Sequence, residues 1–278
     1  SWRRYTNGNF TGIRIMGVFQ NNLLAGAAAA ASAGGAGFYD YQIEQSMRFD
    51  SADGTNLYLG GGSTSGNNDY WTFSFWYKGM SLPSGTSQEF ISAGNGTTSN
   101  SDNLLRIGLL DQSNGSIIRV NSGTANIIDT SGVFRDPSAW THVVWNNNNG
   151  SSVLYVNGTQ VGSGTLDGGS GSAINKANGM YISRERRSAG SYVDGYLAEV
   201  MMISASSSAG TLTPSSFGET KNGVWVPKDI SGLSNQDFYL KFENASDLGN
   251  DSSGNNRDWD VYNAGTDHQV LDSPTFGS

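Results

Sequence analysis

Three observations predict an all-β protein, built as a two-sheet antiparallel β-sandwich with an extended N-terminal arm. The 278 residues include 38 glycines and only 14% charged residues, a composition typical of short strands joined by many turns. Aromatic and β-branched residues gather in segments bounded by Gly, Asn, Asp or Ser. Trp71, Phe73, Phe75 and Tyr77 fall on alternate positions, so one face of that strand is expected in a core. Trp76 breaks the alternation and predicts cover on part of the second face.

From residue 38 onward, the predicted strands follow one another at turn-rich intervals. Met47–Phe49 and Leu57–Leu59 are expected to pair across the turn dipeptide Asp53-Gly54. About ten to twelve strands are expected in all, the others near residues 71–78, 90–91, 104–110, 117–120, 127–128, 140–145, 153–156, 180–183 and 196–203. Asn114-Gly115 and Asn157-Gly158 predict tight hairpins, whereas residues 146–152 and 162–172 are expected at loop tips.

Four of these segments carry a family resemblance. They are Phe73–Lys78, Trp140–Val144, Leu154–Gly158 and Gly195–Ile203. In this order they resemble the F-T-I-S-F-W-V-K, W-x-H-V-x, L-Y-V-N-G and G-x-I-D-E-V-x-I motifs of the laminin-G-like (LamG, concanavalin A-like) jelly roll. Ala198 stands where the family often has Asp. The resemblance covers roughly residues 38–213 and implies the fold, but it implies little about the ligand, because this fold hosts many unrelated functions.

Composition divides the chain into three predicted segments. Residues 1–37 form an anchoring arm, residues 38–213 the sandwich, and residues 214–278 a C-terminal extension that packs on it. Their formal charges are +3, −5 and −6, which sum to the −8 of the whole chain. The acidic body argues against nucleic acid as a partner, and the basic arm predicts contact with another acidic surface.

The arm combines basic, aromatic and apolar residues with a Gly/Ala-rich stretch. Its predicted anchoring residues are Trp2, Arg3, Arg4, Ile13, Arg14 and Phe19. Gln20–Asn22 interrupt its apolar run, which argues against a secretory signal. No run in the chain reaches the roughly 18 apolar residues of a membrane span, so no membrane partner is expected. The Ser-Trp start is that expected of a whole protein after loss of Met.

The C-terminal extension begins with Thr213-Pro214, which predicts a short helical turn. From residue 212 to residue 274 it resembles a segment that recurs in large virion proteins of marine tailed bacteriophages, where it joins successive jelly rolls. We expect it to supply edge or outer-layer strands to the same sandwich.

The sequence offers little catalytic chemistry. Cysteine is absent, which excludes thiol nucleophiles and disulfides. Glucanases of this fold use two carboxylates on one strand face, but Glu199 has no acidic partner two positions away. We therefore expect Glu199 to be structural, holding a loop backbone. His142 and His268 are the only histidines. His142 is expected to be a hydrogen-bonded strand residue rather than part of a Ser-His-Asp triad or a zinc site.

The sequence is compatible with two kinds of binding site. Candidate glycan platforms are Tyr192, Tyr196, Trp225 and Trp259, although the same rings could fill the sandwich or its seam with the extension. Candidate Ca²⁺ ligands are Asp251, Asn255 and Asn256, with a second set at Asp102, Asn103 and Asp111. Ordinary turn formation explains these Asp and Asn residues as well. Ca²⁺ is the one cofactor that the sequence leaves open.

The leading functional hypothesis is a non-enzymatic structural protein on the surface of a tailed-bacteriophage virion. As a capsid decoration, fibre or tail-fibre protein, it would dock on other virion proteins through the arm and display the sandwich for glycan or host-surface attachment. Many copies or a homo-oligomer are expected, because the apolar residues of the arm need neighbours. The alternative is a free carbohydrate-binding lectin with a calcium-assisted site, and a polysaccharide-cleaving enzyme is the least favoured interpretation.

Overall fold

The computed structural model describes residues 38–60, 69–94, 104–166, 174, 179–186, 189–207 and 211–275. The six predicted anchoring residues of the arm therefore lie outside the described residues, as do Asp102 and Asn103. Residues 41–277 belong to one compact unit. The division of the chain at residues 37 and 213 stays a prediction.

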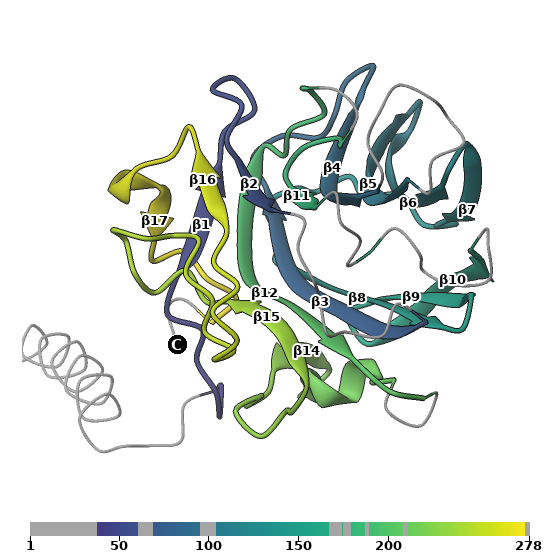
Figure 1. The fold of residues 1–278 in the computed structure, drawn as a ribbon. Helices are drawn as coiled ribbons and strands as arrows, with labels where there is room; N and C mark the ends of the chain where they lie inside the picture. Colours follow the sequence, from purple (N-terminus) through teal and green to yellow (C-terminus); the bar gives the residue numbers. More distant parts are fainter. Residues whose placement is uncertain are drawn as a thin grey trace, which may run out of the picture. The chain divides into compact units, whose positions relative to one another are not determined.

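Two antiparallel sheets form a sandwich, as predicted (Figure 1). The first has the order β10-β9-β8-β3-β12-β1-β17, with β15 paired to β12. Its strands are β10 (Thr159–Thr165), β9 (Ser151–Val156), β8 (Thr141–Asn148), β3 (Tyr70–Gly79), β12 (Gly195–Ser204), β1 (Ser46–Phe49), β17 (Gln269–Val270) and β15 (Gln236–Leu240). The second has the order β16-β2-β11-β4-β5-β6-β7. Its strands are β16 (Asp260–Tyr262), β2 (Asn56–Leu59), β11 (Met180–Ile182), β4 (Ser87–Ala93), β5 (Leu105–Gln112), β6 (Gly115–Ser122) and β7 (Ala125–Asp129).

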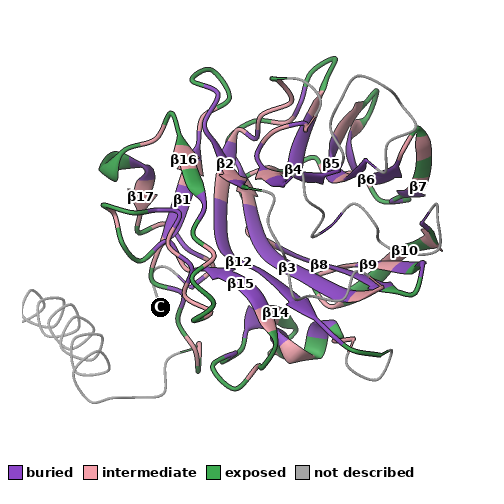
Figure 2. Cartoon of the chain, viewed as in Figure 1, coloured by how far each residue is buried: buried purple, intermediate pink, exposed green. Residues whose placement is uncertain are grey.

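The core lies between the two sheets, and the central strands β3, β8 and β12 of the first sheet are almost entirely buried (Figure 2). The alternating aromatic residues of β3 all point into it, which confirms the period-two prediction. Trp71 meets Trp145 of β8 edge to face, with ring centroids 4.8 Å apart. Trp76 lies on the opposite face of β3 and is buried there with Ile43 and Ala198, so the predicted cover of that face is also confirmed.

The predicted hairpins form. Asn157 and Gly158 join β9 to β10 with φ values of 47° and 78°, which is the left-handed conformation that a type I′ turn requires. The hairpin predicted at Asn114-Gly115 also forms between β5 and β6, but its turn residues are Ser113 and Asn114, because Gly115 already belongs to β6. Residues 146–152 and 162–172 were predicted as loop tips, and this is wrong for most of the described ones. Strands β8, β9 and β10 extend into them, because cross-strand pairing overrides the low strand propensity of Asn, Ser and Gly.

The predicted pairing of the two opening strands is wrong. β1 pairs with β12 and β17, whereas β2 pairs with β11 and β16, so the two strands lie in different sheets. Met47 and Leu57 both point into the core, one from each sheet. The turn at Asp53-Gly54 carries the chain from one sheet to the other.

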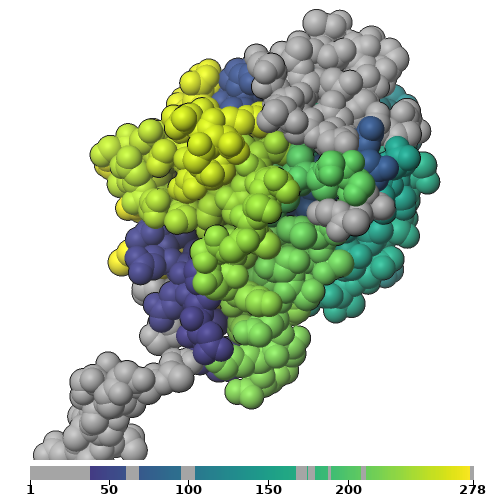
Figure 3. Space-filling model, turned by 60° about the horizontal axis from the view of Figure 1, so that its bottom comes forward, coloured from purple at the N-terminus to yellow at the C-terminus, as the bar shows by residue number. Residues whose placement is uncertain are grey.

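The C-terminal extension supplies strands to both sheets, since it contains β15, β16 and β17. It also forms a separate hairpin from β13 (Gly218–Lys221) and β14 (Val224–Pro227). Figure 3 shows this part of the chain, in light green to yellow, beside the purple residues that precede β1. The predicted turn after Thr213 is the 3₁₀ helix η2 (Pro214–Ser216), and a second one, η3 (Thr266–His268), precedes β17. In the described residues, no helix is long and apolar enough to cross a bilayer.

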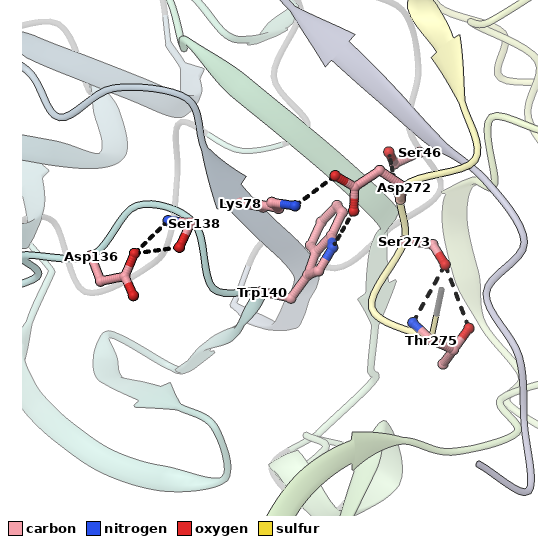
Figure 4. Close-up of polar contacts among 8 residues, drawn as sticks. All are labelled: Ser46, Lys78, Asp136, Ser138, Trp140, Asp272, Ser273 and Thr275. Carbon is pink, nitrogen blue, oxygen red and sulfur yellow. Dashed lines mark hydrogen bonds and ion pairs between the residues drawn. The ribbon is translucent and has the colours of Figure 1, made fainter. Parts of the chain in front are cut away.

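Asp272 fastens the end of the extension to the first sheet. Its carboxylate accepts hydrogen bonds from the ammonium group of Lys78 at 2.6 Å and from the indole nitrogen of Trp140 at 3.1 Å (Figure 4). Its backbone carbonyl accepts one from the hydroxyl of Ser46. Lys78 and Trp140 belong to the strand segments that carry the family resemblance, and the extension uses both as anchor points.

Candidate functional site

The most unusual backbone position of the first sheet is Glu199 in β12. The pairing of β12 with β3 shifts register between Ala198 and Met201, which places a β-bulge at Glu199. Glu199 has a φ of 47°, a left-handed conformation that is costly for a residue with a side chain. Bulges redirect a side chain away from the regular alternation of a strand. Backbone strain of this kind is concentrated at functional sites, so Glu199 is a candidate functional residue.

Three segments converge on the Glu199 carboxyl group. Oε1 accepts a hydrogen bond of 2.5 Å from the hydroxyl of Tyr41, which precedes β1, and one of 2.7 Å from the hydroxyl of Tyr239 in β15. The side chain is buried, and burial disfavours its charged form. Burial therefore raises the pKa of Glu199 to about 7, although the two phenol hydrogen bonds favour the carboxylate and lower it in part. A protonated carboxyl group therefore persists to higher pH here than at an exposed glutamate.

This carboxyl group lines a cavity of about 300 Å³. The other lining residues are Tyr41, Gln42, Ile43, Glu44, Gln45, Tyr239, Lys241 and Glu243. The ammonium group of Lys241 lies 5.5 Å from the centre of the Tyr239 ring. Phe242, between Lys241 and Glu243, has a φ of 58°. We call this feature the Glu199 pocket. It combines aromatic walls with acceptors and donors of hydrogen bonds, the mixture that orients a polar ligand.

The prediction that Glu199 holds a loop backbone is wrong, because its partners are two tyrosine hydroxyls. These tyrosines are 158 and 40 positions away in the sequence. Tyr41 lies in no motif and Tyr239 lies in the C-terminal extension, and nothing in the sequence joins either of them to Glu199. The family motif locates the carboxyl group, and only the fold reveals the pocket.

The four candidate glycan platforms lie in four different settings. Trp259 is 2% exposed and meets Phe238 edge to face in the core, so its prediction as an exposed platform is wrong. Trp225 is half-buried, and its indole nitrogen donates to Nδ1 of His142. Tyr196 lies on β12 with the ammonium group of Lys78 5.9 Å from its ring centre, and Tyr192 packs over Gly54. The apolar bulk that made Trp259 a candidate is what buries it.

His142 is a buried strand residue, as predicted. Its Nδ1 accepts a hydrogen bond of 3.0 Å from Trp225, and its Nε2 lies 2.9 Å from the hydroxyl of Ser74. Burial lowers the pKa of His142 to about 3, so the ring is neutral at physiological pH. A Ser-His-Asp triad needs an acceptor at the second ring nitrogen, but Trp225 can only donate there. The Ser74–His142 pair is therefore structural.

The candidate Ca²⁺ loop uses its oxygen atoms to shape the chain. Oδ1 of Asp251 accepts from the backbone N–H groups of Tyr239 and Ser253, and Oδ2 accepts from the hydroxyl of Ser253 and the N–H of Arg257. The Asn255 amide donates to a backbone carbonyl, and Asn256 takes a left-handed turn conformation. Within the described ranges, no three His, Asp or Glu side chains are grouped to hold a metal ion. Calcium binding at this loop stays a prediction.

A two-sheet antiparallel sandwich with a polar pocket on the outer side of one sheet places the protein among the lectin-like jelly rolls. More specifically, residues 48–212 match the model of the concanavalin A-like lectin/glucanases superfamily, and the chain belongs to this superfamily. Because the match covers more than half of the chain, it confirms the family resemblance of the four strand motifs.

Known structures share the fold at low sequence identity. A candidate carbohydrate-binding protein from Bacteroides ovatus has a TM-score of 0.51 and 13% identity, over 80% of this chain and 58% of that protein. A heptameric pentraxin from Limulus polyphemus has a TM-score of 0.43 and 18% identity, over 58% and 77% of the two chains. The enzymatically active domain of tailspike protein 2 from bacteriophage CBA120 has a TM-score of 0.46 and 17% identity, over 58% and 25%. No curated protein sequence matches the chain.

Proposed function

We propose that the protein is a non-enzymatic glycan-binding protein, displayed on the surface of a tailed-bacteriophage particle, and that it binds a glycan in the Glu199 pocket. The observation that carries the binding role is the pocket itself. A cavity of about 300 Å³ can accept a sugar unit, and Tyr41 and Tyr239 offer ring surface beside the Glu199 carboxyl group. Sugars combine hydroxyl groups with apolar C–H surfaces, so they use both features.

The non-enzymatic assignment rests on the strand that carries Glu199. Its neighbours two positions away are Leu197 and Met201, both buried, so this strand does not supply a carboxylate pair. Glu44 and Glu243 line the same pocket from other segments. A cleavage assay therefore belongs with every binding assay.

The binding role is tested on a glycan array with the full chain and two variants. We expect specific signals from the wild type, a loss of about tenfold or more in affinity for Lys241→Ala and Glu199→Gln, and no shortening of the bound oligosaccharides. Lys228→Ala is the matched control, because Lys228 is an exposed lysine of the same extension outside the pocket. Signals that both pocket variants retain would refute the site, and released sugar fragments would refute the non-enzymatic role.

The virion role rests on the two ends of the chain. Residues 1–37 carry three arginines, no acidic residue and several large apolar residues, which suits a segment that docks on acidic and apolar surfaces of other virion proteins. The extension resembles a segment of tailed-phage virion proteins. Deletion of residues 1–37 should prevent incorporation into particles while leaving glycan binding intact. Normal incorporation of the truncated chain would rule out the anchor.

A free lectin is the second candidate, favoured by the same superfamily match. In this alternative a Ca²⁺ ion at Asp251, Asn255 and Asn256 would assist glycan binding. Array signals that vanish with EDTA and return with Ca²⁺ would support it. Signals unaffected by EDTA would favour the Glu199 pocket, in which no metal is needed.

A further inference from the structure

A second hollow lies on the other outer face of the sandwich, over the seven-stranded sheet. The register of β4 to β7 places Glu89, Gly108, Arg119 and Asp129 in one row across four strands. Their neighbours toward the core, Leu109, Ile118 and Ile128, are buried, so this row points outward. Gly108 is the only member of the row without a side chain, and the hollow opens above it.

Gly108 lets neighbouring atoms approach its backbone more closely than any side chain would allow. A Cβ atom at this position would lie 2.4 Å from the carbonyl oxygen of Gln88 and 2.7 Å from Oε2 of Glu89, closer than real atoms approach. The cavity has a volume of about 110 Å³, and Arg106, Leu110, Arg119 and Asn121 are among its walls. This volume suits one edge of a sugar ring rather than a whole oligosaccharide. We call it the Gly108 hollow.

The two arginines are held in place before any ligand arrives. Nε and Nη2 of Arg119 each donate to Asp129 at 2.6 Å, which leaves Nη1 for another acceptor. Nη1 of Arg106 lies 3.5 Å from Glu89 and 3.9 Å from Glu185. Nε of Arg106 is buried and has no hydrogen-bond partner. The Arg106 side chain is 22% exposed, so its outer guanidinium N–H groups are the donors that can reach a ligand in the hollow.

The charges around the hollow exclude most ionic ligands. Arg106 and Arg119 supply two positive charges, whereas Glu89, Glu185 and Asp129 supply three negative ones. An anion would meet Glu89 at the floor, and a cation would meet two guanidinium groups. A pair of adjacent hydroxyl groups satisfies both sides, because each hydroxyl donates one hydrogen bond and accepts others.

We propose that the Gly108 hollow is a second saccharide site, which binds the adjacent hydroxyl groups of a neutral sugar. Glu89 accepts from these hydroxyls, and Arg106 and Arg119 donate to them. The site shares its ligand class with the proposed function but none of its residues with the Glu199 pocket. The protein therefore holds glycans on both outer faces of the sandwich, so one copy can bridge two chains of a surface polysaccharide.

Backbone amide NMR with neutral gluco-, manno- and galacto-oligosaccharides tests the proposal in the full chain. We expect two separate groups of shifted amides, one on β5 and β6 around Gly108 and one around Glu199. Arg119→Ala should weaken binding at the first group about tenfold or more and leave the second unchanged. Lys241→Ala should do the reverse. Arg135→Ala is the matched control, since Arg135 is an arginine outside both sites that bonds to a backbone carbonyl.

This experiment can refute either site without refuting the other. Shifts confined to the amides around Glu199 would overturn the second site and leave the proposed function standing. Shifts confined to β5 and β6 would do the opposite. Stronger binding of uronic-acid oligosaccharides in the hollow would overturn the neutral-sugar assignment. If Arg119→Ala does not fold, Asn126→Ala at the exposed rim replaces it, and unchanged binding there would count against the site in the same way.

Discussion

His142 and Glu199 are both buried titratable side chains on the outer side of the eight-stranded sheet, yet their surroundings differ in one respect. Both ring nitrogens of His142 have a partner, and the ring stacks between Trp76 and Trp225 with centroid distances of 4.6 and 6.0 Å. Glu199 has two partners on one oxygen and borders a cavity of about 300 Å³. Burial alone does not mark a binding group. Access to a ligand-sized space does.

The same cause shifts the two pKa values in opposite directions. Burial disfavours a charge, so it lowers the pKa of His142 to about 3 and raises the pKa of Glu199 to about 7. His142 therefore stabilises the folded state only while its ring is neutral. Glu199 stabilises the folded state most when its carboxyl group is protonated. The stability of the protein should respond to pH with opposite signs at the two sites.

The largest expected effect is the loss of stability in acid caused by His142. Below pH 6.5 the unfolded chain binds a proton at this ring, whereas the folded ring stays neutral until about pH 3. The contribution is therefore present above pH 6.5 and is lost as the pH falls toward 3, by roughly 5 kcal/mol in full. Denaturant unfolding from pH 7 to pH 3.5 should show a steeper loss for the wild type than for His142→Gln. Parallel curves would contradict the neutral buried ring.

His142→Ala should be nearly as damaging at pH 7. It leaves a cavity between two indole rings and removes the acceptor of the Trp225 N–H, which together cost about 4 kcal/mol. His142→Gln should lose less, because an amide can still accept from Trp225. Equilibrium unfolding of both variants measures the difference, and equal losses would show that the hydrogen bonds contribute little.

Glu199 should produce a smaller effect of opposite sign. Between pH 4.5 and 7 the unfolded carboxyl group loses its proton while the folded one keeps it. Stability from this group is present below pH 4.5 and is lost as the pH rises through 7, by roughly 3 kcal/mol. Glu199→Gln removes the titration, so the free energy of unfolding of the wild type should fall relative to this variant over that range. A difference that is independent of pH would contradict the raised pKa.

The sequence predicts the sandwich well because its evidence is local. The alternation in residues 71–77 and the Asn157-Gly158 turn act over a few positions, and both form as expected. The prediction that β1 pairs with β2 was wrong because the sheet to which a strand belongs depends on the packing of the whole core. A short turn is equally compatible with a hairpin and with a crossing between sheets.

The candidate sites were harder to predict because they are assembled from distant segments. Tyr239 reaches Glu199 because β15 pairs with β12, although the two strands are far apart in the sequence. Trp259 shows a second difficulty, which is that residue type alone does not separate a binding residue from a core residue. A large ring that could bind a sugar is equally able to fill a core. Residue type narrows the candidates, but burial and a cavity decide among them.

Tyr41→Phe should have the smallest effect and the most specific one. It removes one hydrogen bond to Oε1 of Glu199 and costs about 1 kcal/mol, because Tyr239 still donates to the same atom. The lost phenol favoured the carboxylate, so the pKa of Glu199 should rise above 7, as carboxyl-carbon NMR can measure. Tyr262→Phe, at an exposed tyrosine, is the control and should leave this pKa unchanged. If the pKa of Glu199 instead falls in Tyr41→Phe, the hydrogen bond from Tyr41 does not stabilise the carboxylate. Tyr41 would then act mainly by excluding water from the pocket. In that case its ring, and not its hydroxyl group, would prepare the site for a ligand.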